Sequence, residues 1–185
     1  MLVLGLDIST SITGYCLINT EMPLGHRLVE ADGLIISHEK DTYTKSVIIR
    51  ESFLKLSKKH KIDKIVVEEN LQAFRRGLSS AKTLSTLARF NGIVCFIAQD
   101  VFQIPIEMVN VNSARARAGL KVDRKSDVTI KDQIVEWTRS QPDFSSFCWP
   151  TKKLKSGPRK GLVILQSKCY DIADAAVVCL SSTLT

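Results

Sequence analysis

The first third of the chain alternates short apolar runs with turn-forming residues. Residues 2–8 and 14–18 are apolar runs separated by the hydroxyl side chains of residues 9–11, which predicts two strands joined by a tight turn. A third strand is predicted over residues 28–36. Apolar positions at helical spacing among charged residues then predict an amphipathic helix over residues 44–59.

The middle of the chain continues as strand, helix and strand. Residues 62–69 form the short β-branched run IDKIVVEE, which is typical of a buried strand. Apolar residues at helical spacing predict a long helix over residues 79–101. Residues 104–111 predict a fifth strand.

Two further helices are predicted near the C-terminus. The first spans residues 127–139 and is capped by Ser126 or Asp127. The segment 141–161 is rich in proline, glycine and basic residues, which predicts a long basic loop. The alanine- and valine-rich residues 170–180 predict the last helix.

This order of elements predicts the fold class. Three strands in a row, followed by alternating helices and strands, imply an α/β fold with a five-stranded mixed sheet flanked by helices. The chain has 185 residues, the length of one compact domain, so we expect a single domain over residues 1–185.

The composition excludes several classes of protein. Hydrophobic residues make up 44% of the chain, but no apolar run approaches the length of about 20 residues that spans a bilayer. The N-terminus lacks a basic leader, so we expect an intracellular, cytoplasmic protein, with an organellar location left open. The five cysteines are scattered and show no CxxC motif, which argues against both a disulfide framework and a zinc site.

The net charge of +7 is concentrated in the second part of the chain. Residues 1–69 hold 9 Lys/Arg and 10 Asp/Glu, whereas residues 70–185 hold 17 and 9. Two stretches, 70–99 and 144–170, contain no acidic residue. Such a basic surface either binds a polyanion, most often nucleic acid, or is a solvated lysine face. The candidate DNA-binding residues in these stretches are Arg75, Arg76, Lys152, Lys153, Lys155, Arg159 and Lys160.

Four carboxylates stand in otherwise apolar surroundings. Asp7 and Glu68 each end an apolar strand, and Asp171 and Asp174 lie three residues apart on the apolar last helix, so they share one face. Each also has a structural interpretation: Asp7 could cap the following turn, Asp171 could be a helix N-cap, and Glu68 could be exposed at its strand end. The presence of all four in this order favours a shared site.

Converging carboxylates without matched arginines repel one another unless cations neutralise them. Hard divalent cations such as Mg²⁺ do so through oxygen ligands. In two-metal sites one ion activates a water and the other stabilises the leaving oxygen of a phosphodiester. An acidic centre within a basic surface therefore suggests a metal-dependent nuclease.

Four segments resemble the RuvC family of Holliday junction resolvases, which have a ribonuclease H-like fold. They are GLDISTSITGY at 5–15, VVEENLQAF at 66–74, SSAKTLSTLARFNGIV at 79–94 and YDIADAAVV at 170–178. The resemblance implies that Asp7, Glu68, Asp171 and Asp174 are catalytic and hold two Mg²⁺ or Mn²⁺ ions. It further implies a homodimer, which we expect around the helix 79–101, and paired hydrolysis of four-way DNA junctions that leaves 5′-phosphate ends.

The resemblance also suggests further contacts with DNA. Arg115 resembles a lysine of the family that approaches DNA, and Lys131 resembles the lysine that opens the next helix, although plain surface charge is an alternative for both. The family places an aromatic residue that stacks on a base near the branch point after the acidic strand, and either Phe74 or Leu71 occupies that place.

The sequence departs from the bacterial members of the family at two places. Glu69 stands where they commonly have glutamine, and the basic loop 148–161 is longer than theirs. Both features suggest a divergent branch, such as a viral or phage enzyme. Alternative functions are a ribonuclease H-like nuclease for other branched, flap or duplex DNA, and a noncatalytic DNA-binding protein. The string DISTSITG also resembles the first phosphate motif of actin-like and sugar-kinase ATPases, but those need two copies of the fold.

Overall fold

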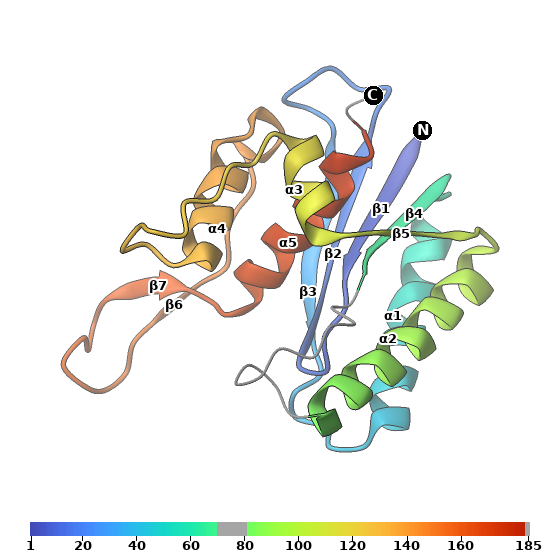
Figure 1. Ribbon diagram of the computed structural model, residues 1–185, viewed down its shortest axis with the longest axis horizontal. Helices are drawn as coiled ribbons and strands as arrows, with labels where there is room; N and C mark the ends of the chain where they lie inside the picture. Colours follow the sequence, from blue (N-terminus) through green and yellow to red (C-terminus); the bar gives the residue numbers. More distant parts are fainter. Residues whose placement is uncertain (70–80, 184–185) are drawn as a thin grey trace.

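The computed structural model describes residues 1–69 and 81–183, and a sheet of five strands lies at its centre (Figure 1). The strands follow the order β3-β2-β1-β4-β5 across the sheet. β1, β4 and β5 run parallel, while β2 is antiparallel to both of its neighbours. The predicted five-stranded mixed sheet is therefore confirmed. The strands are β1 (Leu2–Asp7), β2 (Ile12–Asn19), β3 (Leu28–Ile35), β4 (Lys64–Glu68) and β5 (Ile106–Val109).

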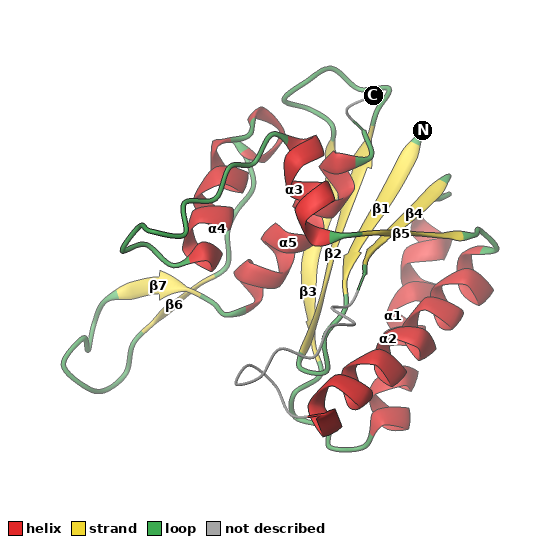
Figure 2. Cartoon of the chain, in the orientation of Figure 1, coloured by secondary structure: helices red, strands yellow, loops and turns green. Residues whose placement is uncertain are grey.

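Helices cover both faces of this sheet (Figure 2). One face packs against α1 (Thr42–Lys59) and α2 (Ala81–Phe102), and the other against α5 (Lys168–Ser181). α3 (Val111–Ala118) and α4 (Ile130–Ser140) pack on the outer side of α5. No helix in the described part of the chain is long and apolar enough to cross a membrane.

Strand alternation divides the core between the two faces. Leu4 and Leu6 of β1 are fully buried on the side of α1 and α2, whereas Val3 faces α5. Asp7 continues the register of Val3, so it also belongs to the α5 face. The same alternation places Glu68 of β4 on the α5 face, because Val66 packs there.

A strip of three glycines lets α5 approach the sheet closely. A Cβ atom added to Gly14 of β2 would lie 2.0 Å from the carbonyl oxygen of Asp171, and one added to Gly5 of β1 would lie 2.5 Å from that of Ala175. At Gly33 of β3 a Cβ would lie 2.8 Å from the Lys168 side chain. No larger residue fits at these positions unless the helix moves away.

The prediction of a loop over residues 141–161 is wrong, because parts of this segment form regular secondary structure. It begins with a short 3₁₀ helix, η1 (Pro142–Phe144), and then forms β6 (Thr151–Lys153), which pairs antiparallel with β7 (Val163–Leu165). β6 has the sequence TKK and is exposed along its whole length. A polar strand without a buried face lacks the apolar alternation by which strands are predicted.

Two features around α3 and α4 also differ from the prediction. α3 was not predicted, and it starts where the fifth strand was expected to end. The cap of α4 is Thr129, whose side chain accepts from the Asp132 amide at 3.1 Å, and not Ser126 or Asp127. Ser126 instead accepts from the Val128 amide at 3.1 Å in the preceding turn.

Candidate active site

Two acidic residues lie at the carboxyl ends of adjacent parallel strands. β1 and β4 pair in a register that sets Leu6 beside Val67, so the next residues, Asp7 and Glu68, are neighbours. Both side chains belong to the α5 face, and both are only partly buried. Two strand ends therefore bring carboxylates from positions 61 residues apart to one edge of the sheet.

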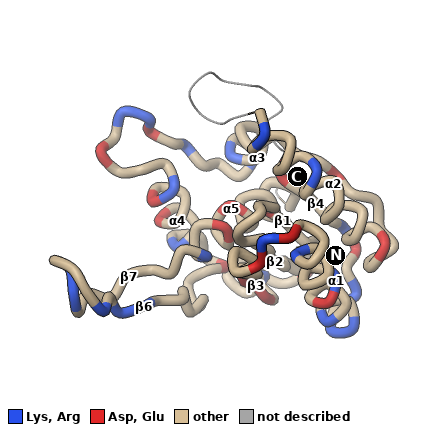
Figure 3. Tube along the Cα trace, turned by 90° about the horizontal axis from the view of Figure 1, so that it is seen from below, with Lys and Arg blue, Asp and Glu red and all other residues tan. Residues whose placement is uncertain are grey.

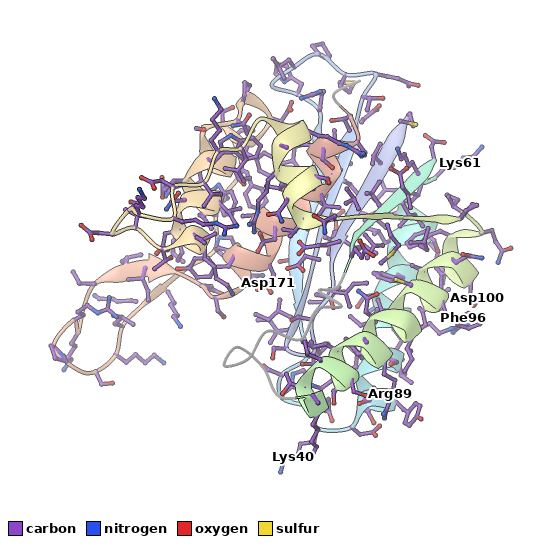
Figure 4. The ribbon with its side chains drawn as sticks, in the orientation of Figure 1. Lys40, Lys61, Arg89, Phe96, Asp100 and Asp171 are labelled. Atoms are coloured by element: carbon purple, nitrogen blue, oxygen red, sulfur yellow. The ribbon has the colours of Figure 1, made fainter. Side chains whose placement is uncertain are left out.

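The last helix adds a second pair of carboxylates at the same place. Gly14 pairs with Asp7 across β1 and β2 and also lies directly against the backbone of Asp171. Asp171 is in the first turn of α5 (Figure 4). Asp174 follows three residues later, about one turn along the helix and on the same face. Between Cys169 and Ser181, only Tyr170, Asp171 and Asp174 are partly exposed, and the other residues of α5 are buried. The two aspartates therefore lie on the side of the helix that solvent can reach.

The charges of these residues are coupled. Burial raises the pKa of Asp7 well above its usual value, and the charges of Glu68, Asp174 and Asp171 raise it further. Burial and then the charge of Asp174 raise the pKa of Glu68 to about 7. The four carboxylates therefore form one electrostatic unit, here called the carboxylate cluster.

Two cations stand at the edge of the carboxylate cluster and offset part of its charge. Arg115 of α3 places Nη2 3.9 Å from Oδ1 of Asp174, and its charge lowers the pKa of Glu68 as well. Burial raises the pKa of Asp171 to about 6, while the charge of Lys131 on α4 opposes that rise. The pKa of Asp174 is raised in spite of both cations, because burial has the larger effect.

The structural interpretations of the single residues do not hold. The turn after β1 is held by Ser9, whose Oγ accepts from the amides of Ser11 and Ile12 at 3.3 and 3.1 Å. α5 begins at Lys168, so Asp171 is not its N-cap. Glu68 is partly buried and is not an exposed strand end.

The chemistry of the cluster fits a hard divalent cation. All donors are carboxylate oxygens, and the neighbouring carboxylate charges add to the effect of burial in raising the pKa values of Asp7 and Glu68, which a dication would oppose. Within residues 1–69 and 81–183, no three acidic, histidine or cysteine side chains are close enough to enclose an ion between them. Asp7, Glu68, Asp171 and Asp174 are the residues that could hold such an ion.

The structure separates the candidate DNA-binding residues into groups. Arg115 and Lys131 lie beside the carboxylate cluster. The five basic residues Lys152, Lys153, Lys155, Arg159 and Lys160 are exposed on or near the β6–β7 hairpin. Phe74, Arg75 and Arg76, together with the alternative Leu71, lie outside the described residues.

One basic residue near the site is not among the DNA-binding residues predicted from the sequence. Arg124, in the loop between α3 and α4, lines a hollow of about 200 Å³ together with Arg115 and Asn112. The available signal was the run of basic residues in KVDRK at 121–125, which follows a helix that was itself not predicted. The hollow extends the basic surface outward from Arg115.

Solved structures with the same fold cover nearly the whole chain. No protein-family model and no curated protein sequence matches it. Thermus thermophilus RuvC in complex with a Holliday junction substrate matches with a TM-score of 0.62 at 15% identity, over 98% of this chain and 91% of that one. The yeast mitochondrial Holliday junction resolvase Ydc2 matches with a TM-score of 0.56 at 14% identity, over 98% and 77%. The fowlpox virus resolvase, in complex with Holliday junction DNA, matches with a TM-score of 0.51 at 14% identity, over 99% and 97%.

The fold and the carboxylate cluster together define the class of the molecule. It is an α/β protein with a ribonuclease H-like fold and an acidic centre at the ends of β1 and β4. Within that class it has the architecture of RuvC and the other Holliday junction resolvases.

Proposed function

We propose that this protein is a metal-dependent endodeoxyribonuclease that resolves four-way DNA junctions by paired cuts leaving 5′-phosphate ends. The observation that carries the proposal is the carboxylate cluster, in which β1, β4 and α5 bring four acidic side chains together on a resolvase fold. A structural role would not require four mutually repelling charges at one sheet edge.

The residues around the cluster divide the work of the reaction. Asp7, Glu68, Asp171 and Asp174 hold two Mg²⁺ or Mn²⁺ ions, which when bound supply water activation and stabilisation of the leaving oxygen. Arg115 and Lys131 offset negative charge where a DNA phosphate approaches the carboxylates. The exposed basic residues of the hairpin bind phosphates of the flanking duplex.

Paired cuts require two sites, so we further propose that the protein acts as a homodimer. A four-way junction has approximate two-fold symmetry, which an isologous dimer matches. α2 carries Phe96, 73% exposed on the outer side of the helix, which supports an interface there. We place this activity in one domain, within an intracellular compartment that contains DNA.

Cleavage of a four-way junction, compared with duplex, flap and single-stranded DNA, tests the proposal. We expect junction cleavage to require Mg²⁺, and Asp7→Asn or Asp174→Asn to abolish it without weakening junction binding. Less negative charge near the phosphates leaves binding unchanged or tighter. Lys61→Ala, at an exposed position before β4, provides a folded control outside both the carboxylate cluster and the proposed interface on α2. Near-normal turnover by either Asn variant would refute the assignment.

A further inference from the structure

The β6–β7 hairpin projects from the body of the protein (Figure 1). All residues from Thr151 to Val163 are exposed except Leu154, which is partly exposed. Leu162 and Val163 are 54% and 64% exposed, although both are apolar. A two-stranded hairpin with water on both faces is only marginally stable by itself, which indicates that this one is completed by a partner.

The charge of the hairpin identifies the chemistry of that partner. Four lysines and one arginine lie between residues 152 and 160, and no acidic residue occurs from 144 to 170 (Figure 3). None of these five side chains forms an ion pair with another residue in the described part of the chain. A polyanion complements such a surface, whereas an apolar protein face would leave the charges without partners.

The register of the hairpin places basic and apolar side chains together on both of its faces. Lys153 pairs with Val163 and Lys152 pairs with Ile164, so each face presents a lysine beside an apolar side chain. Lysines reach phosphates, and apolar groups contact the methyl groups on base edges. With strands about 4.8 Å apart plus side chains, the ribbon matches the major groove, about 12 Å wide, and exceeds the minor groove, about 6 Å wide.

The root of the hairpin is fixed to the helix that carries two of the cluster carboxylates. Gln166 donates its amide N–H to the Pro150 carbonyl and its Nε2 to the Thr151 carbonyl, both at 2.9 Å. Cys169 of α5 donates its thiol to the same Pro150 carbonyl at 3.2 Å. Only two residues separate β7 from α5. The root of the ribbon is therefore anchored to the helix that carries Asp171 and Asp174.

We propose that the β6–β7 hairpin lies in the major groove of a duplex arm next to the cut and sets the position of the cut along that arm. This inference rests on the proposed function and extends it. From Leu165 to Leu162, where Leu154 donates to the Leu162 carbonyl, the paired ribbon advances about 10 Å at roughly 3.3 Å per residue, which corresponds to about three base pairs at 3.4 Å each. The paired ribbon thus covers about three base pairs of the groove from its root, and the turn beyond it extends this reach.

Dimethyl sulfate protection tests this placement, because the reagent methylates guanine N7 in the major groove and adenine N3 in the minor groove. The wild-type protein on a junction in Ca²⁺ is compared with a shortened variant, in which Asn-Gly replaces residues 153–163 and closes the hairpin after the Lys152–Ile164 pair. Lys40→Ala/Lys61→Ala is the matched control, since both lysines are exposed and remote from the hairpin (Figure 4). We expect N7 protection over about three or more base pairs beside the cut in the wild type and the control, and its loss in the shortened variant.

Cleavage in Mg²⁺ then separates the two proposals. Because the hairpin also contributes to DNA binding, rates are compared at protein concentrations that saturate the junction. We expect the shortened variant then to keep cleavage within about tenfold of the wild-type rate, but to distribute its cuts over several neighbouring phosphodiesters. Unchanged N7 protection in the shortened variant, protection confined to adenine N3, or an unchanged single cut position would overturn the role of the hairpin while leaving the nuclease intact. A wild-type protein that protects N7 but cleaves no junction would instead overturn the proposed function.

Discussion

Substitution of Gly14 by alanine tests how the carboxylate cluster is assembled. The new methyl group would lie 2.0 Å from the carbonyl oxygen and 2.4 Å from the carbonyl carbon of Asp171. Both are backbone atoms, so no side-chain rotation relieves the clash. The N-terminal part of α5 must move by about 1–1.5 Å to restore van der Waals contact of about 3.5 Å.

The displacement has two consequences of different size. Overpacking of this kind costs about 1–3 kcal/mol of unfolding free energy, so the protein remains folded. The same movement carries the Asp171 carboxylate away from Asp7, and a misplacement of about 1 Å in a catalytic site can lower the rate about 100-fold. We therefore expect a loss of activity that is far larger than the loss of stability explains.

Thermal unfolding and junction cleavage are measured in parallel, with Gly92→Ala as the matched control. A Cβ at Gly92 of α2 meets no atom within 4 Å, so alanine should stabilise the helix by about 0.5–1 kcal/mol and leave cleavage unchanged. Because Gly92 is exposed on α2, the oligomeric state of both variants is checked by light scattering. If Gly14→Ala cleaves and unfolds like the wild type, α5 does not depend on the glycine strip and the reasoning fails.

Three further predictions concern pH, a buried ion pair and salt. Burial raises the pKa of Glu68 to about 7 and that of Asp171 to about 6, above their unfolded values, so the folded state takes up protons on acidification. In denaturant titrations without metal, the unfolding free energy should rise by about 1–3 kcal/mol between pH 8 and pH 5, and a fall would contradict the prediction. Asp143 is buried and accepts from Arg27 Nη2 at 2.7 Å, so Asp143→Ala should cost about 3 kcal/mol in the same titration at pH 7. Because that hydrogen-bonded ion pair lowers the pKa of Asp143, its contribution is present above about pH 4 and lost below, and the wild type and the variant should differ less at pH 3. Replacing Lys152, Lys153 and Lys155 of the hairpin by alanine should lower the slope of log affinity against log salt by up to about 0.9 per lost phosphate contact, on duplex and junction alike, and an unchanged slope would show that these lysines contact no phosphate.

The sheet and its helices could be predicted because their apolar residues are periodic. β1 and β4 each contain an apolar run followed directly by a carboxylate, and these carboxylates also indicated the cluster. α3 has eight residues and only alanine and valine as apolar residues, so its periodicity is weak. Its Asn110 cap and the Gly119 that ends it with φ 79° were the available signals.

The remaining features depend on contacts that no local pattern contains. Thr151–Lys153 has the sequence pattern of a loop because the strand is exposed on both faces. It pairs with Val163–Leu165, and even the nearest paired residues, Lys153 and Val163, are ten positions apart in the sequence. The proximity of Asp171 to Gly14 arises from packing between segments more than 150 residues apart. Sequence spacing placed Asp171 and Asp174 on one face, but only the fold places that face over the end of β1.

The glycine strip under α5 also determines when the carboxylate cluster can exist during folding. The strip is complete only after β1, β2 and β3 have paired in register, because each strand contributes one glycine. A slip of one residue in β2 would bring Thr13 or Tyr15 under the helix and exclude it. α5 follows all five strands of the sheet in the sequence and is synthesised after them, so we expect it to dock on a finished sheet. Partly folded chains would then carry the four acidic residues but would not bring them together.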